Sequence, residues 1–324
     1  EVAERSRRTI DHALNGPVGH AMQGLHNTLN SLKLAQGAEI PEEFKSRIEC
    51  LLAAPGEGGD HAVTIITRQI RWLYYLDPEW IKERVMPWFS FDDELSEPAW
   101  NGYLSAGELP PLEIGVALKP LLLELFPRLY KWSWGQHLAT VAAQIAIELA
   151  VFRSDEPDGL TGKEARHCLR NMNDKNRQDA IFRLGVIGRR GEDGWSEHVV
   201  TFINTVWPRE RTFRTSNLVS SWVSLLDGTG EKFPEVLSAV RRFLVPVERG
   251  SHWLYQFSRE VGGEEPLTIK YPADVLELLD AVIPNSAEDV PYELVQILDL
   301  IEETDPALVS DRRFVRLIDL IEQT

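Results

Sequence analysis

The segment Asp299-Leu-Ile-Glu-Glu-Thr304 returns twenty residues later as Asp319-Leu-Ile-Glu-Gln-Thr324, with five of its six residues identical. A weaker copy, Leu276–Val282, precedes the first by nineteen residues. Twenty residues hold one helix and its loop, so two units form an antiparallel pair of about forty residues. This period is typical of HEAT-like α-solenoids, in which each helix pair covers its apolar stripe with the next pair. The alternative is a coincidence between amphipathic helices.

Helical spacing of apolar residues extends through most of the chain. Residues 58–75 show it in Val63, Ile66, Ile70, Leu73 and Tyr74. Helix starts are marked by the capping Asp of Asp77-Pro78-Glu79 and by the capping box Thr161-Gly-Lys-Glu164. The sequence therefore predicts an all-α fold, a HEAT-like α-solenoid or helical-repeat array of about fifteen helices of about 10–20 residues. Residues 241–271 are the least regular part of this pattern.

Tryptophan and proline are concentrated between residues 77 and 135. The tryptophans are Trp80, Trp88, Trp100, Trp132 and Trp134. We interpret them as a packed junction rather than a binding cage, and expect a kink or a break at Pro120, which lies within an apolar helical pattern. These features predict three parts: an N-terminal sub-array over 1–107, a junction with long buried helices over 108–155, and a C-terminal repeat sub-array over 156–324.

The composition limits the classes of function and location. A net charge of −16 argues against a general affinity for nucleic acid or for anionic membranes. The two cysteines, Cys50 and Cys168, suit a reducing cytosol, so a cytoplasmic location is expected. No stretch has the roughly 18 uninterrupted apolar residues of a membrane span, and Leu138–Val151 is better interpreted as a buried helix. Because the chain begins at Glu1 without Met, we expect it to be a piece of a longer protein.

Motifs for catalysis or cofactor binding are incomplete. Gly162-Lys163 resembles part of a phosphate-binding loop, but Pro157 replaces its first glycine and Glu164 its hydroxyl. His167 and Cys168 are adjacent, so on a helix they point about 100° apart and cannot easily hold one metal or form a nucleophile–base pair. The histidines at 12, 20 and 26 lack a carboxylate frame, and His198 is far from Cys168 in sequence. We therefore predict no catalytic, metal or cofactor site in this segment.

Charge is distributed unevenly along the chain. Residues 161–214 contain eleven Lys and Arg against seven Asp and Glu, a net +4, whereas residues 273–324 contain three against thirteen, a net −10. The basic stretch is either a solvated helical face with internal ion pairs or a surface for an acidic partner, protein or nucleic acid. Its candidate partner-binding residues are Lys163, Arg166, Arg170, Lys175, Arg177, Arg183, Arg189 and Arg190. Trp195 and Trp207 are either further contacts on a concave face or part of the core.

Three segments between Trp80 and Leu125 resemble a known family. They are Met86-Pro-Trp-Phe89, Glu97-Pro-Ala-Trp-Asn-Gly-Tyr-Leu104 and Leu118-Lys-Pro-Leu-Leu-Leu123. They are similar to the helical C-terminal region, of unknown function, of bacterial SIR2-family anti-phage defence proteins. The resemblance spans about residues 70–210 and implies a helical array that restrains an NAD⁺-consuming domain or senses an invader. The Gly-rich dinucleotide loop of that family is missing here, so none of its catalytic residues can be transferred.

Three hypotheses follow. The first is a non-catalytic scaffold for protein recognition, the sensor or regulatory region of a SIR2-type NAD-depleting defence protein, whose partner is the effector domain or an invader protein. The second is a nucleic-acid-binding helical repeat that uses residues 161–214. The third is a helical enzyme with a site that the sequence pattern does not reveal. The repeats and the incomplete motifs favour the first.

Overall fold

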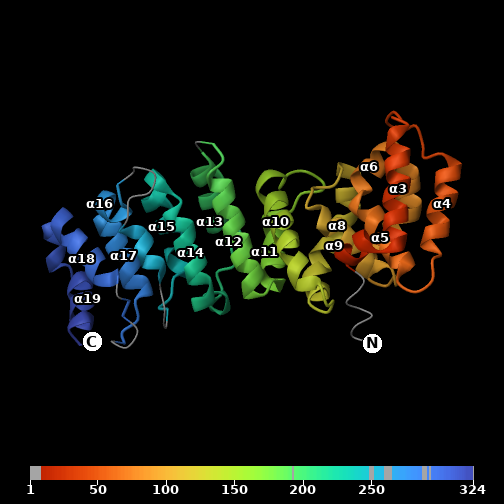
Figure 1. Ribbon diagram of the computed structural model, residues 1–324. Helices are drawn as coiled ribbons and strands as arrows, with labels where there is room; N and C mark the ends of the chain where they lie inside the picture. Colours follow the sequence, from red (N-terminus) through yellow and green to blue (C-terminus); the bar gives the residue numbers. More distant parts are fainter. Residues whose placement is uncertain are drawn as a thin grey trace. The chain divides into compact units, whose positions relative to one another are not determined.

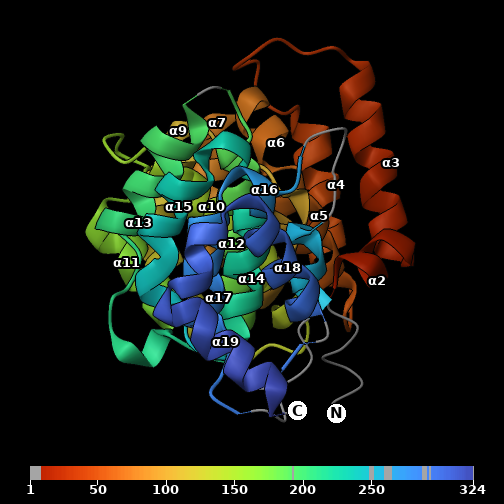
Figure 2. The ribbon, with the colours of Figure 1, turned by 90° about the vertical axis from the view of Figure 1, so that its left-hand side faces the viewer.

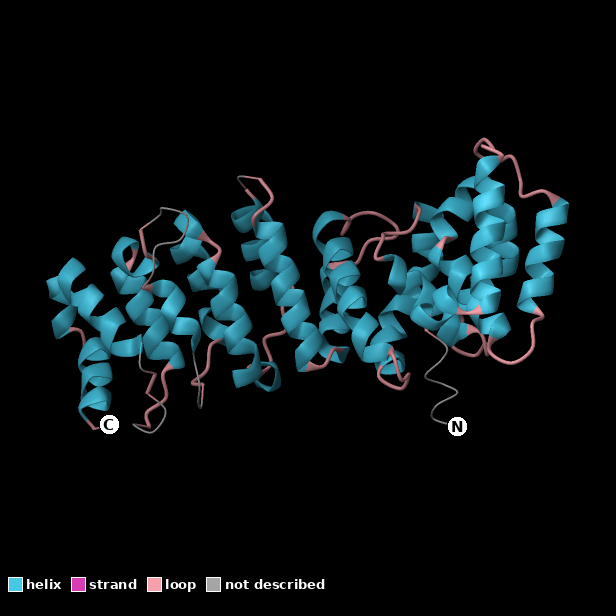
Figure 3. Cartoon of the chain, in the orientation of Figure 1, coloured by secondary structure: helices cyan, strands magenta, loops and turns pink. Residues whose placement is uncertain are grey.

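Every regular element that the structure describes is helical. The computed structural model describes residues 9–191, 193–247, 252–258, 265–286, 290–291 and 293–323. Within these ranges there are 18 α-helices, joined by short 3-10 and π-helical turns, and no β-strand (Figure 3). The predicted all-α class is confirmed. Ten residues of the irregular stretch 241–271 lie outside the described residues, and the helical elements in its described part are 3-10 turns and one short helix.

The chain divides into two compact units. Unit 1 comprises Glu1–Met172 and unit 2 comprises Asn173–Thr324. This boundary falls between two helices, whereas the sequence placed its boundaries after residues 107 and 155. The predicted division into two sub-arrays and a junction stays a prediction.

Unit 1 is built around helix α5 (Gly58–Arg68), which contacts its neighbours α2, α3, α4 and α8. Its α-helices are α2 (Ile10–Asn15), α3 (Pro17–Ser31), α4 (Glu42–Leu52), α5, α6 (Ile70–Leu76), α7 (Pro78–Trp80), α8 (Ser96–Ala106), α9 (Leu112–Leu129), α10 (Gly135–Phe152) and α11 (Gly162–Asn171). Two further turns are η1 (Ile81–Val85) and η2 (Met86–Phe89). Eight consecutive residues of α5 are buried, so this helix is covered on most of its circumference.

The predicted cap at Asp77 ties three segments of unit 1 together. Its carboxylate accepts hydrogen bonds from the backbone N–H of Trp80 and of Ile40 and forms a 2.8 Å ion pair with the Lys45 ammonium. Burial by itself would raise the pKa of Asp77, but the hydrogen bond from Lys45 and the two backbone donors lower it below its usual value. The cap predicted at Thr161 also forms, as a complete capping box with Glu164.

The tryptophan-rich region is mostly core, as the sequence predicted. Trp88, Trp100 and Trp134 are buried, whereas Trp80 and Trp132 are partly exposed. The Trp100 indole N–H donates to the Phe89 carbonyl at 3.1 Å, so its polar atom is satisfied inside the core. Aromatic rings here position helices and do not form a cage.

Helix α9 continues through Pro120, so the helix does not break there, and the other expected outcome, a kink, stays a prediction. Proline removes one backbone donor and so costs one hydrogen bond of the helix. On either side of it, Leu118 and Leu122 are buried in the core. The burial of these flanking turns offsets the lost hydrogen bond, because helices in proteins are stabilised mainly by the packing of their apolar face.

Helix α10 is a core helix of unit 1. By length and composition alone it could cross a membrane, and it is the one helix among the described residues that passes this test. However, 56% of its apolar window is buried within the protein. This burial agrees with the interpretation of Leu138–Val151 as a buried helix.

Unit 2 consists of helices whose second neighbours in sequence contact each other. Helix α12 contacts α14, α15 contacts α17, α16 contacts α18 and α17 contacts α19 (Figure 1, and Figure 2 after a quarter turn). The α-helices are α12 (Asp174–Gly188), α13 (Thr201–Thr205), α14 (Ser216–Asp227), α15 (Phe233–Val240), α16 (Leu267–Lys270), α17 (Pro272–Val282), α18 (Glu293–Thr304) and α19 (Arg312–Glu322). The turns η3 (Gly194–Val200), η4 (Arg211–Phe213), η5 (Gly230–Lys232), η6 (Arg241–Phe243), η7 (His252–Phe257) and η9 (Pro306–Ser310) connect them.

Several polar contacts between different elements join residues 35 to 41 positions apart, although others lie outside this range, such as Gln256 with Val223 (33 apart) and Ile10 with Asn101 (91 apart). In unit 2 these pairs include Thr215 with Asp174 (41 apart), Gln178 with Asn217 (39), Ser196 with Glu235 (39), Arg242 with Asn204 (38) and Arg316 with Asp280 (36). In unit 1 they include Ile40 with Asp77, Arg71 with Glu108 and Trp134 with Glu97, each 37 apart. These separations match the length of two helices with their loops.

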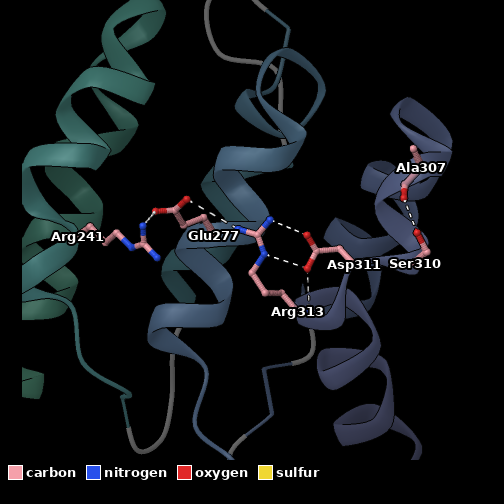
Figure 4. A network of polar contacts seen from close by, with 6 residues as sticks. All are labelled: Arg241, Glu277, Ala307, Ser310, Asp311 and Arg313. Atoms are coloured by element: carbon pink, nitrogen blue, oxygen red, sulfur yellow. Dashed lines mark hydrogen bonds and ion pairs between the residues drawn. The ribbon is translucent and has the colours of Figure 1, made fainter.

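One ion-pair network crosses three elements at this spacing. Arg241 of η6 pairs with Glu277 of α17 at 2.8 Å, and Glu277 also lies 3.8 Å from Arg313 of α19 (Figure 4). Arg313 in turn pairs with Asp311 at 2.7 Å. Successive partners are 36 residues apart, from 241 to 277 and from 277 to 313. Each pair is at least partly exposed and therefore contributes little stability.

The two similar hexapeptides, 299–304 and 319–324, lie at the ends of helices of unit 2 but do not occupy equivalent positions. Ile301 of α18 is fully buried, whereas its counterpart Ile321 of α19 is partly exposed. Conversely, Leu320 is buried and its counterpart Leu300 is partly exposed. The last residue of the second copy, at 324, lies outside the described residues. The two hexapeptides therefore share an amphipathic pattern, but their equivalent residues are packed differently.

Candidate ligand-binding groove

The eight predicted partner-binding residues lie on two helices of different units. Lys163, Arg166 and Arg170 belong to α11 of unit 1, and the other five belong to α12 of unit 2 and the turn that follows it. The exposed ones are Lys163, Arg170, Lys175, Arg189 and Arg190, the partly exposed ones Arg166 and Arg183, and the buried one Arg177.

Internal contacts engage several of these cations. The Arg177 guanidinium is 2.9 Å from the Asp174 carboxylate and stacks over the Phe213 ring at 4.8 Å, so this buried residue holds α12 to its neighbours. Burial alone would raise the pKa of Asp174, but the hydrogen bonds from Arg177 and Thr215 lower it. Lys175 pairs with Asp179 at 3.4 Å. The residues Arg166, Arg170, Arg183 and Arg190 also have partners within the chain.

Of the eight candidates, Arg189 and Lys163 have no polar partner among the described residues. Arg189 also lines a groove. This groove lies between α12 and α14 and has a volume of about 330 Å³. Its lining is formed by Gln178, Ile181, Phe182, Gly185 and Arg189 on the α12 side and by Ser220, Ser221, Ser224 and Leu225 on α14. We call it the α12–α14 groove. Its volume is at the lower end of the range for ligand sites.

Spacing along the helices explains why these residues line one groove. On the α12 side, the positions 178, 181, 182, 185 and 189 recur at three- and four-residue steps, so they share one face. The same holds for Ser220, Ser221 and Ser224 on α14. Phe182 is 62% exposed, the largest exposed fraction among the large apolar side chains of the described residues. Phe182 and Gly185 are not among the residues that the sequence pattern singled out.

Arg189 extends from the end of α12 toward the end of α14. A Cβ atom added to Gly228, the residue after α14, would lie 2.7 Å from the Arg189 Nη1 atom, so the guanidinium lies directly against that backbone. The carboxyl end of a helix carries a partial negative charge, which favours a cation at this place. Five N–H donors are thereby held at the groove with no carboxylate among the lining residues.

A second pocket, in unit 1, has a different electrostatic character. It has a volume of about 980 Å³ and lies between α6, the start of α9 and the end of α10. Both of its arginines are paired with carboxylates of the same lining, Arg71 with Glu108 and Arg153 with Asp158. These cations are therefore less available to a ligand than Arg189.

The geometry does not support a nucleophilic or metal centre in the described residues. Cys168 is buried, and burial together with the nearby Glu164 raises the pKa of its thiol to about 12. His167 is exposed and contacts Asn171, so it faces away from the thiol. His26 is buried against Trp72, and burial lowers its pKa to about 4. No group of three His, Cys, Asp or Glu side chains in the described portion could hold a metal ion.

The two cysteines are expected to react very differently with a thiol reagent. Cys50 is exposed on α4, whereas Cys168 is fully buried and its thiol resists ionisation. Native protein should therefore be labelled once, at Cys50, and a second label should appear only in denaturant. Mass spectrometry of the alkylated protein measures this. Fast labelling of Cys168 in the native protein would contradict its position in the core.

Comparisons with known proteins give one distant relative. The chain is 20% identical over 317 residues to "Uncharacterized protein y4cA" of Sinorhizobium fredii (strain NBRC 101917 / NGR234). The match covers 95% of this chain and 26% of that protein, so the chain spans about a quarter of its relative's length. No family model matches the chain, and no solved structure matches it significantly.

Proposed function

We propose that this chain is a non-catalytic scaffold of HEAT-like helical repeats that recognises a protein partner in the cytoplasm. The observation that supports the repeat most directly is the recurrence of interhelical polar contacts at separations of 35 to 41 residues in both units. In a repeat array each helix pair contacts its neighbours, so such contacts fall at one repeat length. The α12–α14 groove is the surface on which this proposal places the partner.

The resemblance to SIR2-family proteins adds a biological setting to the proposal. The motif residues Trp88, Trp100 and Leu118 are all buried, so the similar residues are ones that maintain packing. We infer that the chain is the sensor or regulatory region of an NAD-depleting defence protein whose catalytic domain lies elsewhere. The relative is about four times as long as the matched region, which leaves room for further domains in that protein.

Small-angle scattering tests the repeat architecture. A compact globule of 324 residues has a radius of gyration of about 20 Å. Helix pairs stacked one after another form a longer body, so the measured radius should exceed this value clearly. A radius of about 20 Å, with a distance distribution typical of a globule, would contradict the array.

Photo-crosslinking tests recognition, and an NAD⁺ assay tests the absence of catalysis. A photoreactive amino acid at position 182, in cells that carry the gene, should give a discrete protein adduct. The same amino acid at the exposed position 302 of α18 serves as the control and should give none. Adducts at both positions alike, or at neither, would count against a partner at this groove. Rapid NAD⁺ loss with the purified chain would overturn a non-catalytic function.

A further inference from the structure

We propose that the α12–α14 groove binds a short, extended, acidic peptide segment that places an apolar or aromatic side chain on Phe182 and a carboxylate on Arg189. This inference rests on the proposed function, since it specifies the chemistry of the protein partner. Three features of the groove support it: its length, its charge and the glycine at its floor.

The length of the groove suits an extended segment of about five residues. From Gln178 to Arg189 the α12 side extends over eleven residue steps. At about 1.5 Å per helical residue this is about 16 Å. An extended chain advances about 3.3 Å per residue, so about five residues fill the groove. Serine hydroxyls along the facing helix can bond to the backbone of such a segment.

The charge of the groove selects an anionic partner. Arg189 is the one charged residue among those that line it. A guanidinium binds a carboxylate through two parallel hydrogen bonds, a geometry that gives both strength and direction. The net charge of the chain is −16, so most of the surface repels an acidic peptide and the groove is a local exception. Phe182, which lines the same groove, offers an exposed ring for an apolar side chain.

Gly185 has no side chain, so the floor of the groove is open at this position. The packing of the protein itself does not require a glycine there. A Cβ atom at this position would have only ordinary contacts, the nearest at 3.7 Å with the Arg189 guanidinium. At Gly188, one turn later, a Cβ atom would lie 2.4 Å from the Trp195 ring, so packing does require a glycine. Glycine in a helix interior is destabilising relative to alanine. The missing side chain at 185 therefore favours close approach of a ligand rather than stability.

The same contacts favour a peptide over a nucleic acid. Single-stranded nucleic acids are held through several phosphates at once and by stacking of bases. Phe182 could stack a base, but Lys175 and Arg177 of the same helix are engaged by Asp179 and Asp174. One cation with three neighbouring hydroxyls matches a single carboxylate better than a run of phosphates.

Retention of defined peptide pools on the immobilised 324-residue chain tests the proposal. One pool contains short random peptides with Asp or Glu alternating with Phe, Tyr, Trp or Leu, and the second replaces the acids by Lys or Arg. The wild-type chain should retain the acidic pool at least about tenfold more than the basic pool. A fluorescent single-stranded oligonucleotide is the third probe. Tighter binding of the oligonucleotide than of the acidic pool would overturn the peptide assignment.

Five variants connect retention to the groove. Arg189→Ala, Phe182→Ser and Gly185→Leu should each reduce retention of the acidic pool at least about tenfold. Lys163→Ala, which removes one exposed positive charge from α11, is the matched control and should retain the pool like the wild type. Gly185→Ala should melt no lower than the wild type and still weaken retention, which separates loss of the groove from loss of the fold.

Each outcome decides between the two proposals. If Arg189→Ala and Lys163→Ala reduced retention of the acidic pool equally, the assignment of binding to the α12–α14 groove would be overturned. Equal retention of both pools by the wild-type chain would also overturn it. If no pool is retained but position 182 still crosslinks a protein, the acidic-peptide inference fails and the scaffold function stands. If neither peptides nor crosslinks are found, both fail.

Discussion

Replacing Gly102 with alanine is expected to destabilise unit 1 by about 3 kcal/mol or more. Gly102 lies on α8 where it crosses α5, and a Cβ atom there would be 2.1 Å from the Thr64 carbonyl oxygen and 2.2 Å from the Thr67 hydroxyl. The first of these atoms belongs to the backbone, so the two helices must separate to make room. Urea unfolding followed by circular dichroism measures the loss as a lower midpoint.

A second glycine provides the control for this substitution. Gly24 lies in the interior of α3, and a Cβ atom there would meet nothing within 4 Å. Gly24→Ala should therefore raise the free energy of unfolding by up to about 1 kcal/mol, because alanine restricts the unfolded chain and favours the helix. If the two variants had equal stability, the close contact between α5 and α8 would be refuted.

Truncating Trp222 to alanine is expected to destabilise unit 2 by about 4 kcal/mol. Its side chain is fully buried, lies edge-on to Trp207 with ring centres 4.7 Å apart, and stacks on Phe243 at 5.7 Å. Removing the indole leaves a cavity beside the rings of Trp207 and Phe243 that cannot close without moving helices. Thermal and urea unfolding of the variant should both show the loss.

Phe182 serves as the aromatic control in the same unit. Because most of its side chain is exposed, Phe182→Ala should change the free energy of unfolding by less than about 0.5 kcal/mol. The same substitution removes the ring on which the proposed peptide packs. A large loss of stability in this variant would show that Phe182 belongs to the core, and the proposed groove would lose its aromatic side.

The helices and their caps could be predicted from short stretches of sequence. The carboxylate of Asp77 and the capping box at Thr161 form as expected, since their hydrogen bonds join residues three positions apart. The burial of Trp88 and Trp100 was expected too. For Trp195 and Trp207 both surface and core were considered, and both are buried. Deciding between these alternatives required the packing of the neighbouring helices.

The candidate site could be predicted only in part. The sequence named Arg189 among eight basic residues but could not distinguish it from Arg177, which is buried against Asp174 and Phe213. The partners that decide this are brought together by folding, such as Thr215, which bonds to Asp174 over 41 residues. Phe182 and Gly185 were missed because an exposed ring and an open floor have no local sequence signature.

The sequence by itself determined that the chain is helical and where many of its helices begin. These properties depend on hydrogen bonds and apolar spacing within a few turns of one helix. Only the tertiary structure decided which cations are engaged, which glycines are needed for close packing, and where a groove remains open. Those properties depend on contacts between helices, which no single stretch of sequence contains.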